Sequence, residues 1–345
     1  MLVTKTPLRE AQKVKQVIIK NNLLNSEYLL EKDSKFIYFP LNIKKTQISA
    51  IKKKIKTTII NKSLKKKTQP PTLQELLKNK FTKKELSLIP SSQERVGSIL
   101  ILEIPRELIK KETHLAKAFL ETVQGIITVV KKEHFHEGTY RLRKVRVLAG
   151  KKTKETTHTE SGIKLKLDLE KTYFSARSAN ERLRISKLIK PNEEILIMFS
   201  GAAPYPLVLA KNSSVKKIWG IEINPLAHQY ALNNVKLNKL ESKIIIQNGD
   251  VRELLPKIKK KFDRIIMPLP KTAEEFLDVA LKKAKPNTII HLYAFLNETD
   301  ISKEAKVIKE ICNQNKHKVR VLRKVKCGQF SPNIFRVCFD LKILN

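Results

Sequence analysis

Residues 194–250 read EILIMFSGAAPYPLVLAKNSSVKKIWGIEINPLAHQYALNNVKLNKLESKIIIQNGD. Short apolar runs at 194–199, 218–223 and 243–248 predict strands, and the longer segments between them are compatible with helices. Two more strands are predicted at 263–267 and 288–295. Strands that alternate with helices favour the α/β class, here a parallel, doubly wound, Rossmann-like sheet.

The loop after the first predicted strand is a candidate ligand site, because ligands bind beyond the carboxyl ends of the strands in such sheets. It contains Phe199, Gly201 and Pro204. Gly201 permits close backbone approach at a helix entrance, where free N–H groups can face a ligand. A dinucleotide-binding loop would have a second glycine where this chain has Ala203. The loop therefore disfavours a dinucleotide.

Two carboxylates follow the next two strands. Glu222, with Ile223 after it, ends the second strand at roughly the 20-residue spacing from a glycine loop at which an acid accepts ribose hydroxyls. Asp250 follows the third strand, where it can accept from an adenine amine while the N–H of Val251 reaches the ring. A glycine loop, a ribose acid and an adenine acid in this order describe a nucleoside cofactor.

Two smaller domains are predicted before this sheet, at residues 1–68 and 72–168, so that the third domain spans 169–345. The lysine-dense stretch 52–67, followed by Pro70 and Pro71, predicts a linker or a ligand-facing edge. Residues 1–70 contain 17 Lys and Arg against 4 Asp and Glu, a net charge of +13. We expect this small α/β module to dock a polyanion.

The whole chain of 345 residues has a formal net charge of +37 and 41% hydrophobic residues. The charge favours a polyanionic partner, and the hydrophobic content is sufficient for globular packing. The longest segment without a charge, 195–210, contains Gly201 and two prolines and is shorter than the roughly 20 apolar residues of a membrane-spanning helix.

The remaining exclusions concern the compartment and metals. The opening MLVTKTPLRE lacks the apolar core of a secretory signal. Cys312, Cys327 and Cys338 form no CxxC pair, so the sequence predicts neither a disulfide framework nor a zinc module. We expect a cytoplasmic protein that requires no metal.

Six segments of the third domain together resemble one family. They are KTYFSARSANERLRI (171–185), IMFSGAAPYPLVLAK (197–211), GIEINPLAHQYALNNVKLNKLE (220–241), NGDVREL (248–254), DRIIMPLPKTAEEFL (263–277) and IIHLYAF (289–295). They resemble the archaeal and eukaryotic tRNA (guanine-37-N1)-methyltransferases and the related wybutosine-pathway transferases. The resemblance extends more loosely to YRLRKVRVLAG (140–150) and to the opening segment.

This resemblance implies a class I methyltransferase domain with S-adenosylmethionine as methyl donor and tRNA as partner. On the family pattern, Glu181 falls on the general base, with Arg182 beside it and Arg141 reaching into the site. The implied cofactor-binding residues are Tyr173, Arg182, Phe199, Gly201, Pro204, Glu222, Ile223, Asp250, Val251 and Pro268. The implied substrate-binding residues are Arg141, Arg143, Lys144, Arg177 and Pro268.

The implied chemistry agrees with the residue types. Ring nitrogen 1 of guanine carries a proton near neutral pH, so a base such as Glu181 has to remove it as the methyl group is attacked. Charge then develops on the carbonyl oxygen of the base, where Arg141 or Arg182 can stabilise it. Without the resemblance, a solvated helix face with i,i+3 pairing is the favoured interpretation of Glu181 and Arg182.

Three positions depart from the family pattern. Ile197 stands where an acid is usual, so the ammonium group of the cofactor needs another partner, and Ala203 replaces a common glycine. Pro268 replaces an asparagine beside the target base. We expect this last change to broaden the substrate range toward a tricyclic wyosine precursor (imidazo-guanosine) at position 37.

Two alternative functions stay open at this point. The first is the aminocarboxypropyl transferase of the wybutosine pathway, which shares the fold and the donor but attacks a different carbon. The second is a non-catalytic tRNA-binding protein that retains only the fold. Glu181 and the complete first domain favour methylation.

Overall fold

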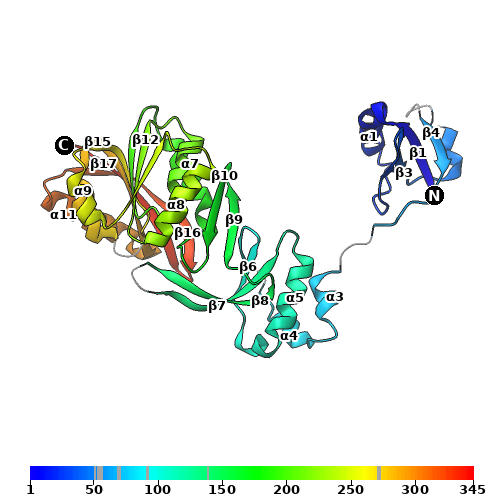
Figure 1. Ribbon diagram of the computed structural model, residues 1–345, viewed down its shortest axis with the longest axis horizontal. Helices are drawn as coiled ribbons and strands as arrows, with labels where there is room; N and C mark the ends of the chain where they lie inside the picture. The colour runs from blue at the N-terminus through cyan, green and yellow to red at the C-terminus, as the bar shows by residue number, and fades with distance from the viewer. Residues whose placement is uncertain (50–51, 53–56, 68–70, 91–92, 138–139, 270–272) are drawn as a thin grey trace. The chain divides into compact units, whose positions relative to one another are not determined.

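The computed structural model describes residues 1–345 except 50–51, 53–56, 68–70, 91–92, 138–139 and 270–272 (Figure 1). At 45 and 134–137 it describes the backbone alone. Its contacts divide the chain into two compact units, Met1–Pro71 and Thr72–Asn345. Each unit has its own hydrophobic core.

The first unit is a four-stranded sheet that packs against the helix α1. The sheet has the order β2-β3-β1-β4, from β1 (Leu2–Pro7), β2 (Glu31–Lys32), β3 (Phe36–Pro40) and β4 (Thr58–Asn61), and α1 spans Ala11–Lys20. Val14 and Ile18, one helical turn apart, pack with Phe39 and Ile59. The prediction of a linker over 52–67 is wrong in part, because β4 lies inside that stretch and pairs with β1.

The second unit begins with two short helices and a four-stranded sheet. The helices are α3 (Leu73–Leu77) and α4 (Lys83–Ser87), and α5 spans Glu112–Thr122. The sheet has the order β5-β6-β7-β8, with bounds Glu94–Val96, Ile99–Leu102, Thr128–Glu137 and Leu142–Gly150. A separate hairpin, β9 (Glu155–Glu160) and β10 (Ile163–Asp168), leads into the large sheet.

The large sheet has seven strands in the order β13-β12-β11-β14-β15-β17-β16. The first five are parallel: β11 (Glu194–Met198), β12 (Lys217–Glu222), β13 (Ile244–Asn248), β14 (Phe262–Met267) and β15 (Ala284–Asn297). β17 (Ile334–Ile343) and β16 (Val319–Ser331) complete it in the antiparallel sense. The doubly wound sheet is confirmed, and its antiparallel end adds two strands that the sequence did not predict.

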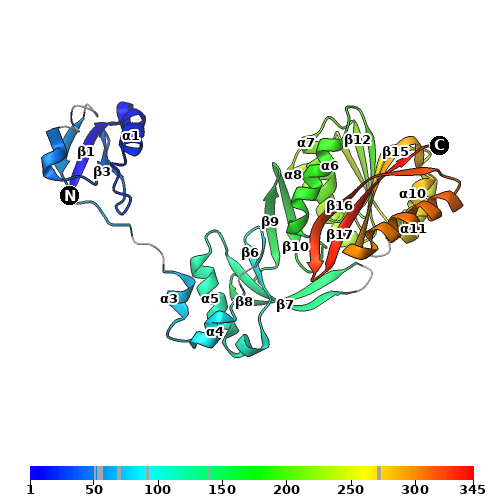
Figure 2. The same ribbon diagram turned by 180° about the vertical axis from the view of Figure 1, so that it is seen from behind.

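Helices cover both faces of this sheet (Figures 1 and 2). α6 (Ala179–Leu188), α7 (Pro204–Asn212) and α8 (Pro225–Leu237) contribute to one core, and α9 (Val251–Lys257), α10 (Leu277–Leu281) and α11 (Ile301–Gln314) contribute to the other. Side chains alternate between the faces of β11 accordingly: Ile195 and Ile197 join the first core, and Leu196 and Met198 join the second. None of the helices in the described part of the chain has the length and apolar character needed to cross a membrane.

Candidate active site

The turn after β11, at the edge of the large sheet, contains three residues with left-handed backbone. Phe199, Gly201 and Ala203 have φ values of +60°, +57° and +71°. The left-handed region costs a residue with a Cβ about 1 to 2 kcal/mol, so surrounding structure must hold Phe199 and Ala203 there. The Phe199 ring packs edge-on against Phe276 with 5.0 Å between centroids, and Ala203 is fully buried ahead of α7.

Glu222, at the end of β12, faces this turn. One of its carboxylate oxygens accepts the Gly201 N–H at 2.6 Å, and the other accepts the Asn224 N–H at 2.9 Å. Burial raises the pKa of Glu222, and the two backbone hydrogen bonds only partly oppose this effect. No Lys or Arg of the described residues forms an ion pair with it, so its remaining lone pairs suit neutral donors such as hydroxyl groups.

Asp250 occupies the equivalent position after β13. Its side chain caps α9 by accepting the Arg252 N–H at 2.7 Å. Asn248 donates through its side-chain amide to the Glu222 carbonyl at 2.7 Å, and the Gly249 N–H donates to the same carbonyl at 3.0 Å. These bonds hold the tips of β12 and β13 together, so both acids border one space.

That space is a cleft of about 230 Å³, and a smaller inner pocket of about 60 Å³ adjoins it. Tyr173, Phe199, Gly201 and Pro268 line both. The cleft is also lined by Glu222, Ile223, Asp250 and Val251, and the inner pocket by Arg182 and Pro204. Every residue predicted to bind the cofactor therefore lies at one of these two adjoining cavities.

Arg141 lines the cleft from the four-stranded sheet of the second unit. It stands at the start of β8, with φ +50°, and lines the cleft beside Tyr140. Burial lowers the pKa of Arg141, while the nearby Tyr173 hydroxyl partly opposes this shift. A guanidinium in this half-buried position can face a carbonyl oxygen that gains charge.

Glu181 and Arg182, adjacent on α6, have separate partners. The Arg182 guanidinium lines the inner pocket and donates from Nε and Nη2 to the two carboxylate oxygens of Glu160, at 2.6 Å each. Glu181, 3% exposed, accepts from Arg184 at 2.7 and 2.8 Å and from the Tyr293 hydroxyl at 2.7 Å. Because Tyr293 lines the inner pocket, Glu181 lies one hydrogen bond behind its wall.

Comparison with known proteins connects this geometry to a family. Family models match residues 156–322 as TRM5/TYW2 methyltransferase domain, 73–153 as TYW2 N-terminal domain and 4–45 as tRNA methyltransferase 5 N-terminal domain. The chain is 32% identical to the tRNA (guanine(37)-N(1))-methyltransferase Trm5b of Pyrococcus abyssi, over 99% of both chains. The chain belongs to the TRM5/TYW2 family.

Solved structures of TRM5/TYW2 proteins have the same fold. The crystal structure of Pyrococcus abyssi Trm5b superposes with a TM-score of 0.72 at 32% identity and covers 100% of both chains. A complex of aTrm5 with tRNALeu gives a TM-score of 0.71 at 31% identity, also over 100% of both chains. The Pyrococcus horikoshii TYW2 structure with MeSAdo gives 0.68 at 29% identity over 79% of this chain and 98% of its own.

Some residues at the TRM5/TYW2 site were not predicted from the sequence. Those at the cleft are Tyr140, Asn224, Arg252, Leu269 and Phe276, and those at the inner pocket are Ser178, Tyr205, Tyr293 and Arg336. The sequence could have identified Asn224, because Asn followed by Pro is typical of the start of a helix, and the Asn224 side chain caps α8. No sequence pattern identified Arg336, because it lies on β17, a strand that the sequence did not predict.

The structure corrects the interpretation of Arg143 as a substrate contact in this TRM5/TYW2 chain. Its guanidinium is 3% exposed, pairs with Glu94 at 3.1 Å and donates to the Phe174 carbonyl at 2.6 Å. Arg143 thus joins the middle sheet to the segment before α6, where no RNA phosphate can reach it. Lys144 and Arg177 are exposed and line neither cavity.

A buried group of possible metal ligands lies behind the site. His291, Cys338 and Asp340 hold ligand atoms within 4.8 Å of one another. Arg264 contacts the His291 ring at 2.7 Å, and Arg184 donates to Asp340 at 2.8 Å. Because two guanidinium groups occupy the positions around these ligands, the group is an internal charge network and does not suit a cation.

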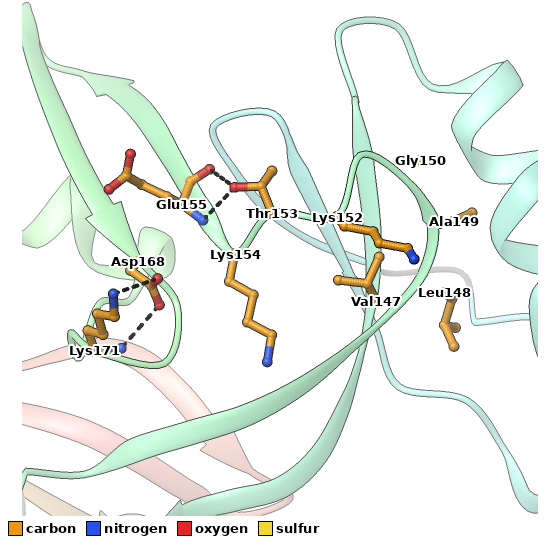
Figure 3. Close-up of a pocket in the computed structure, with 10 residues that line it drawn as sticks. All are labelled: Val147, Leu148, Ala149, Gly150, Lys152, Thr153, Lys154, Glu155, Asp168 and Lys171. Atoms are coloured by element: carbon orange, nitrogen blue, oxygen red, sulfur yellow. Dashed lines mark hydrogen bonds and ion pairs between the residues drawn. The ribbon is translucent and has the colours of Figure 1, made fainter.

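A basic groove of about 730 Å³ lies where the middle sheet meets the β9–β10 hairpin. Figure 3 shows the lining side chains of Lys152, Lys154 and Lys171, together with Asp168 near Lys171. Lys154 pairs with Glu170 at 2.7 Å. The groove therefore presents lysines from two segments of the TRM5/TYW2 chain, the loop between β8 and β9 and the segment after β10.

Proposed function

We propose that this protein transfers a methyl group from S-adenosylmethionine to ring nitrogen 1 of the guanosine at position 37 of tRNA. The match of residues 4–45 to the tRNA methyltransferase 5 N-terminal domain carries this proposal. The relatives that cover 99% of this chain are guanine-37 methyltransferases, whereas the aminocarboxypropyltransferase of Pyrococcus horikoshii covers 79% of it. The aminocarboxypropyl alternative is therefore not favoured.

The cofactor is S-adenosylmethionine, which supplies an electrophilic methyl group on a sulfonium. Glu222 would accept the ribose hydroxyls, and Asp250 with Val251 would hold the adenine. Burial of Glu222 without a cationic partner among the described residues supports this assignment, since neutral hydroxyl donors then satisfy it best. Tyr173, Gly201 and Pro268, common to both cavities, would flank the reacting end.

The proton on ring nitrogen 1 goes to Glu181 in this proposal. Three donors from Arg184 and Tyr293 occupy its carboxylate. Glu181 therefore acts either after one of these contacts opens or through the Tyr293 hydroxyl, which can pass a proton from the inner pocket. Arg141 would stabilise the negative charge on the carbonyl oxygen of guanine, and fixed charges of this kind lower the barrier by a few kcal/mol.

Transfer of the tritium-labelled methyl group to tRNA transcripts tests the function. Label should enter a transcript with guanosine at position 37, and mass spectrometry of the nucleosides should find 1-methylguanosine. A transcript with adenosine at that position is the control. Incorporation that is equal for both transcripts, or addition of an aminocarboxypropyl group, would reject the proposal.

A second activity on a tricyclic wyosine precursor is favoured by one residue. Pro268, which lines both cavities, has no side-chain amide to select guanine. Nanoarchaeum equitans Taw22, named as a guanine-37 and 4-demethylwyosine-37 methyltransferase, is 32% identical over 65% of this chain. Methyl transfer to tRNA that carries the tricyclic base tests this activity, and no incorporation would exclude it.

The tRNA partner is assigned to two surfaces. We place the anticodon loop at the cleft of the second unit and a remote part of the tRNA on residues 1–68, in a cytoplasmic protein. The net charge of +13 over residues 1–70 supports the second contact, because it attracts phosphates without requiring base recognition.

A further inference from the structure

Two guanidinium groups line the inner pocket, and their charges are balanced differently. Arg182 is 2% exposed, and both carboxylate oxygens of Glu160 neutralise it. Arg336, on β17, forms no ion pair with any carboxylate of the described residues. The pocket therefore carries one uncompensated positive charge.

Neutral groups hold Arg336 at the pocket wall. Its Nη1 donates to the Ser178 hydroxyl, its Nη2 donates to the Cys327 carbonyl at 2.9 Å, and its Nε contacts the Cys327 sulfur at 3.3 Å. These contacts fix the planar group without neutralising it. A half-buried cation held in this way is stabilised when an anion binds beside it.

The chemistry of the cofactor supplies that anion. S-adenosylmethionine ends in an amino-acid tail with one carboxylate and one ammonium group. With the nucleoside between Glu222 and Asp250, the tail extends past Tyr173 and Gly201 toward the inner pocket, because these two residues line both cavities. Ile197, fully buried in the core, offers no carboxylate for the ammonium group.

We propose that Arg336, together with the Ser178 hydroxyl, binds the carboxylate of the S-adenosylmethionine tail. The carboxylate then fixes the tail in the pocket, because Arg336 of β17 and Ser178 of the turn before α6 both bind it. This inference rests on the proposed position of the nucleoside in the cleft. It makes Arg336 a cofactor-binding residue of this chain and assigns the side of the inner pocket lined by Arg336 and Ser178 to the amino-acid end.

Two ligands separate the contribution of the carboxylate to binding from those of the ammonium group and the nucleoside. Decarboxylated S-adenosylmethionine keeps the ammonium group, and methylthioadenosine has no amino-acid tail. Calorimetry on the full chain should find that Arg336→Gln weakens binding of S-adenosylmethionine and S-adenosylhomocysteine by about 10- to 100-fold, as expected for a charge-assisted hydrogen bond. Binding of decarboxylated S-adenosylmethionine and of methylthioadenosine should stay within about twofold of the wild type, since neither has the carboxylate.

Arg320→Gln, on the neighbouring strand β16 and exposed, is the matched control and should change none of these affinities. Unchanged S-adenosylmethionine binding in Arg336→Gln would overturn the proposal, and so would an equal loss for methylthioadenosine. If Arg336→Gln does not fold, Arg336→Lys and Ser178→Ala should give smaller losses restricted to ligands with the carboxylate. Glu222→Gln tests the nucleoside position separately, because it should weaken all four ligands.

Discussion

Two carboxylates of the second unit are held in opposite ways. Among the described residues, Glu222 accepts only from backbone N–H groups, so hydroxyl donors of a ligand can complete its hydrogen bonding. Glu181 is bound in a bidentate ion pair by Arg184 and takes a third bond from Tyr293. The first arrangement suits a residue that binds a ligand. The second suits a general base that takes the proton when the substrate is in place, either after one of its contacts opens or through the Tyr293 hydroxyl.

Replacing Glu181 with Gln removes the proposed base and keeps the side-chain volume. We expect kcat to fall by about 10²- to 10⁴-fold, the usual contribution of general base catalysis, with no change in S-adenosylmethionine affinity. Single-turnover methyl transfer and calorimetry measure the two quantities. Glu310→Gln, an exposed position on α11, is the control. Full activity of Glu181→Gln would remove this residue from the mechanism.

Tyr293→Phe separates the two routes for the proton. Loss of the hydroxyl leaves Glu181 and the ring in place, so a relay through Tyr293 predicts that kcat falls by about 10²-fold or more. If Glu181 instead contacts the guanine directly after one contact opens, kcat should stay close to the wild-type value. Methyl transfer under single-turnover conditions, at saturating tRNA, distinguishes the two.

The affinity for S-adenosylmethionine should depend on pH through Glu222. Burial raises its pKa above the ordinary value of 4.5, and only the ionised form accepts two ribose hydroxyls. Affinity should therefore decrease as pH falls through this raised pKa and be constant above it. Calorimetry at a series of pH values tests this, with circular dichroism to confirm that the unit remains folded. An affinity that does not change over the range where the unit is folded would contradict the ribose assignment.

At the scale of elements, a charge network joins α6, β15 and β17. Arg184 of α6 contacts Asp340 of β17, which accepts from His291 of β15 at 2.6 Å. Burial alone would raise the pKa of Asp340, but the hydrogen bonds from His291 and Arg184 hold it well below its usual range. The same network positions the Glu181 side chain, because Arg184 contacts both acids.

Asp340→Asn should destabilise the second unit by about 1.5 to 3 kcal/mol, the usual contribution of a hydrogen bond to a charged group, because it weakens the bonds from Arg184 and His291 while Arg184 keeps its ion pair with Glu181. Because the pKa of Asp340 is depressed, its contribution is fully present above its ordinary pKa of 3.8 and is lost as pH falls through the lowered value. The variant should therefore lose part of the acid dependence of stability. Urea unfolding from about pH 2 to about pH 7 measures both effects, and equal curves for the two proteins would contradict them.

Sequence patterns identified the elements whose signal is local. Parallel strands such as β11 are continuous apolar runs, and the acids that follow β12 and β13 lie at one sheet edge because parallel strands end together. β4 was not predicted because it lies within a lysine-rich stretch, and β16 was not predicted because Lys and Arg interrupt its apolar residues. The place of β17 depends on its pairing with the distant strand β15. The partners of Glu181 and Arg143 also depend on contacts between distant segments, which no spacing rule contains.

At the scale of the whole molecule, our proposal gives the two units different functions: the first contributes to tRNA binding, and the second binds the cofactor. Met1–Pro71 has its own core and sheet, and both described cavities lie within Thr72–Asn345. Deleting residues 1–71 should weaken tRNA binding and reduce the slope of log affinity against log salt, because fewer phosphates are neutralised. Binding of S-adenosylmethionine should not change. Loss of cofactor binding in the truncated protein would disprove this division.

The position of β17 also bears on synthesis at the ribosome. β17 follows the other strands in sequence, yet it lies between β15 and β16 and brings Arg336 to the inner pocket. A nascent chain that has exposed β11 to β15 can form the parallel half of the sheet, but its pocket lacks one wall until β17 emerges and inserts. Incomplete translation products should consequently not sequester the cofactor, and the enzyme becomes competent in one late step of its folding.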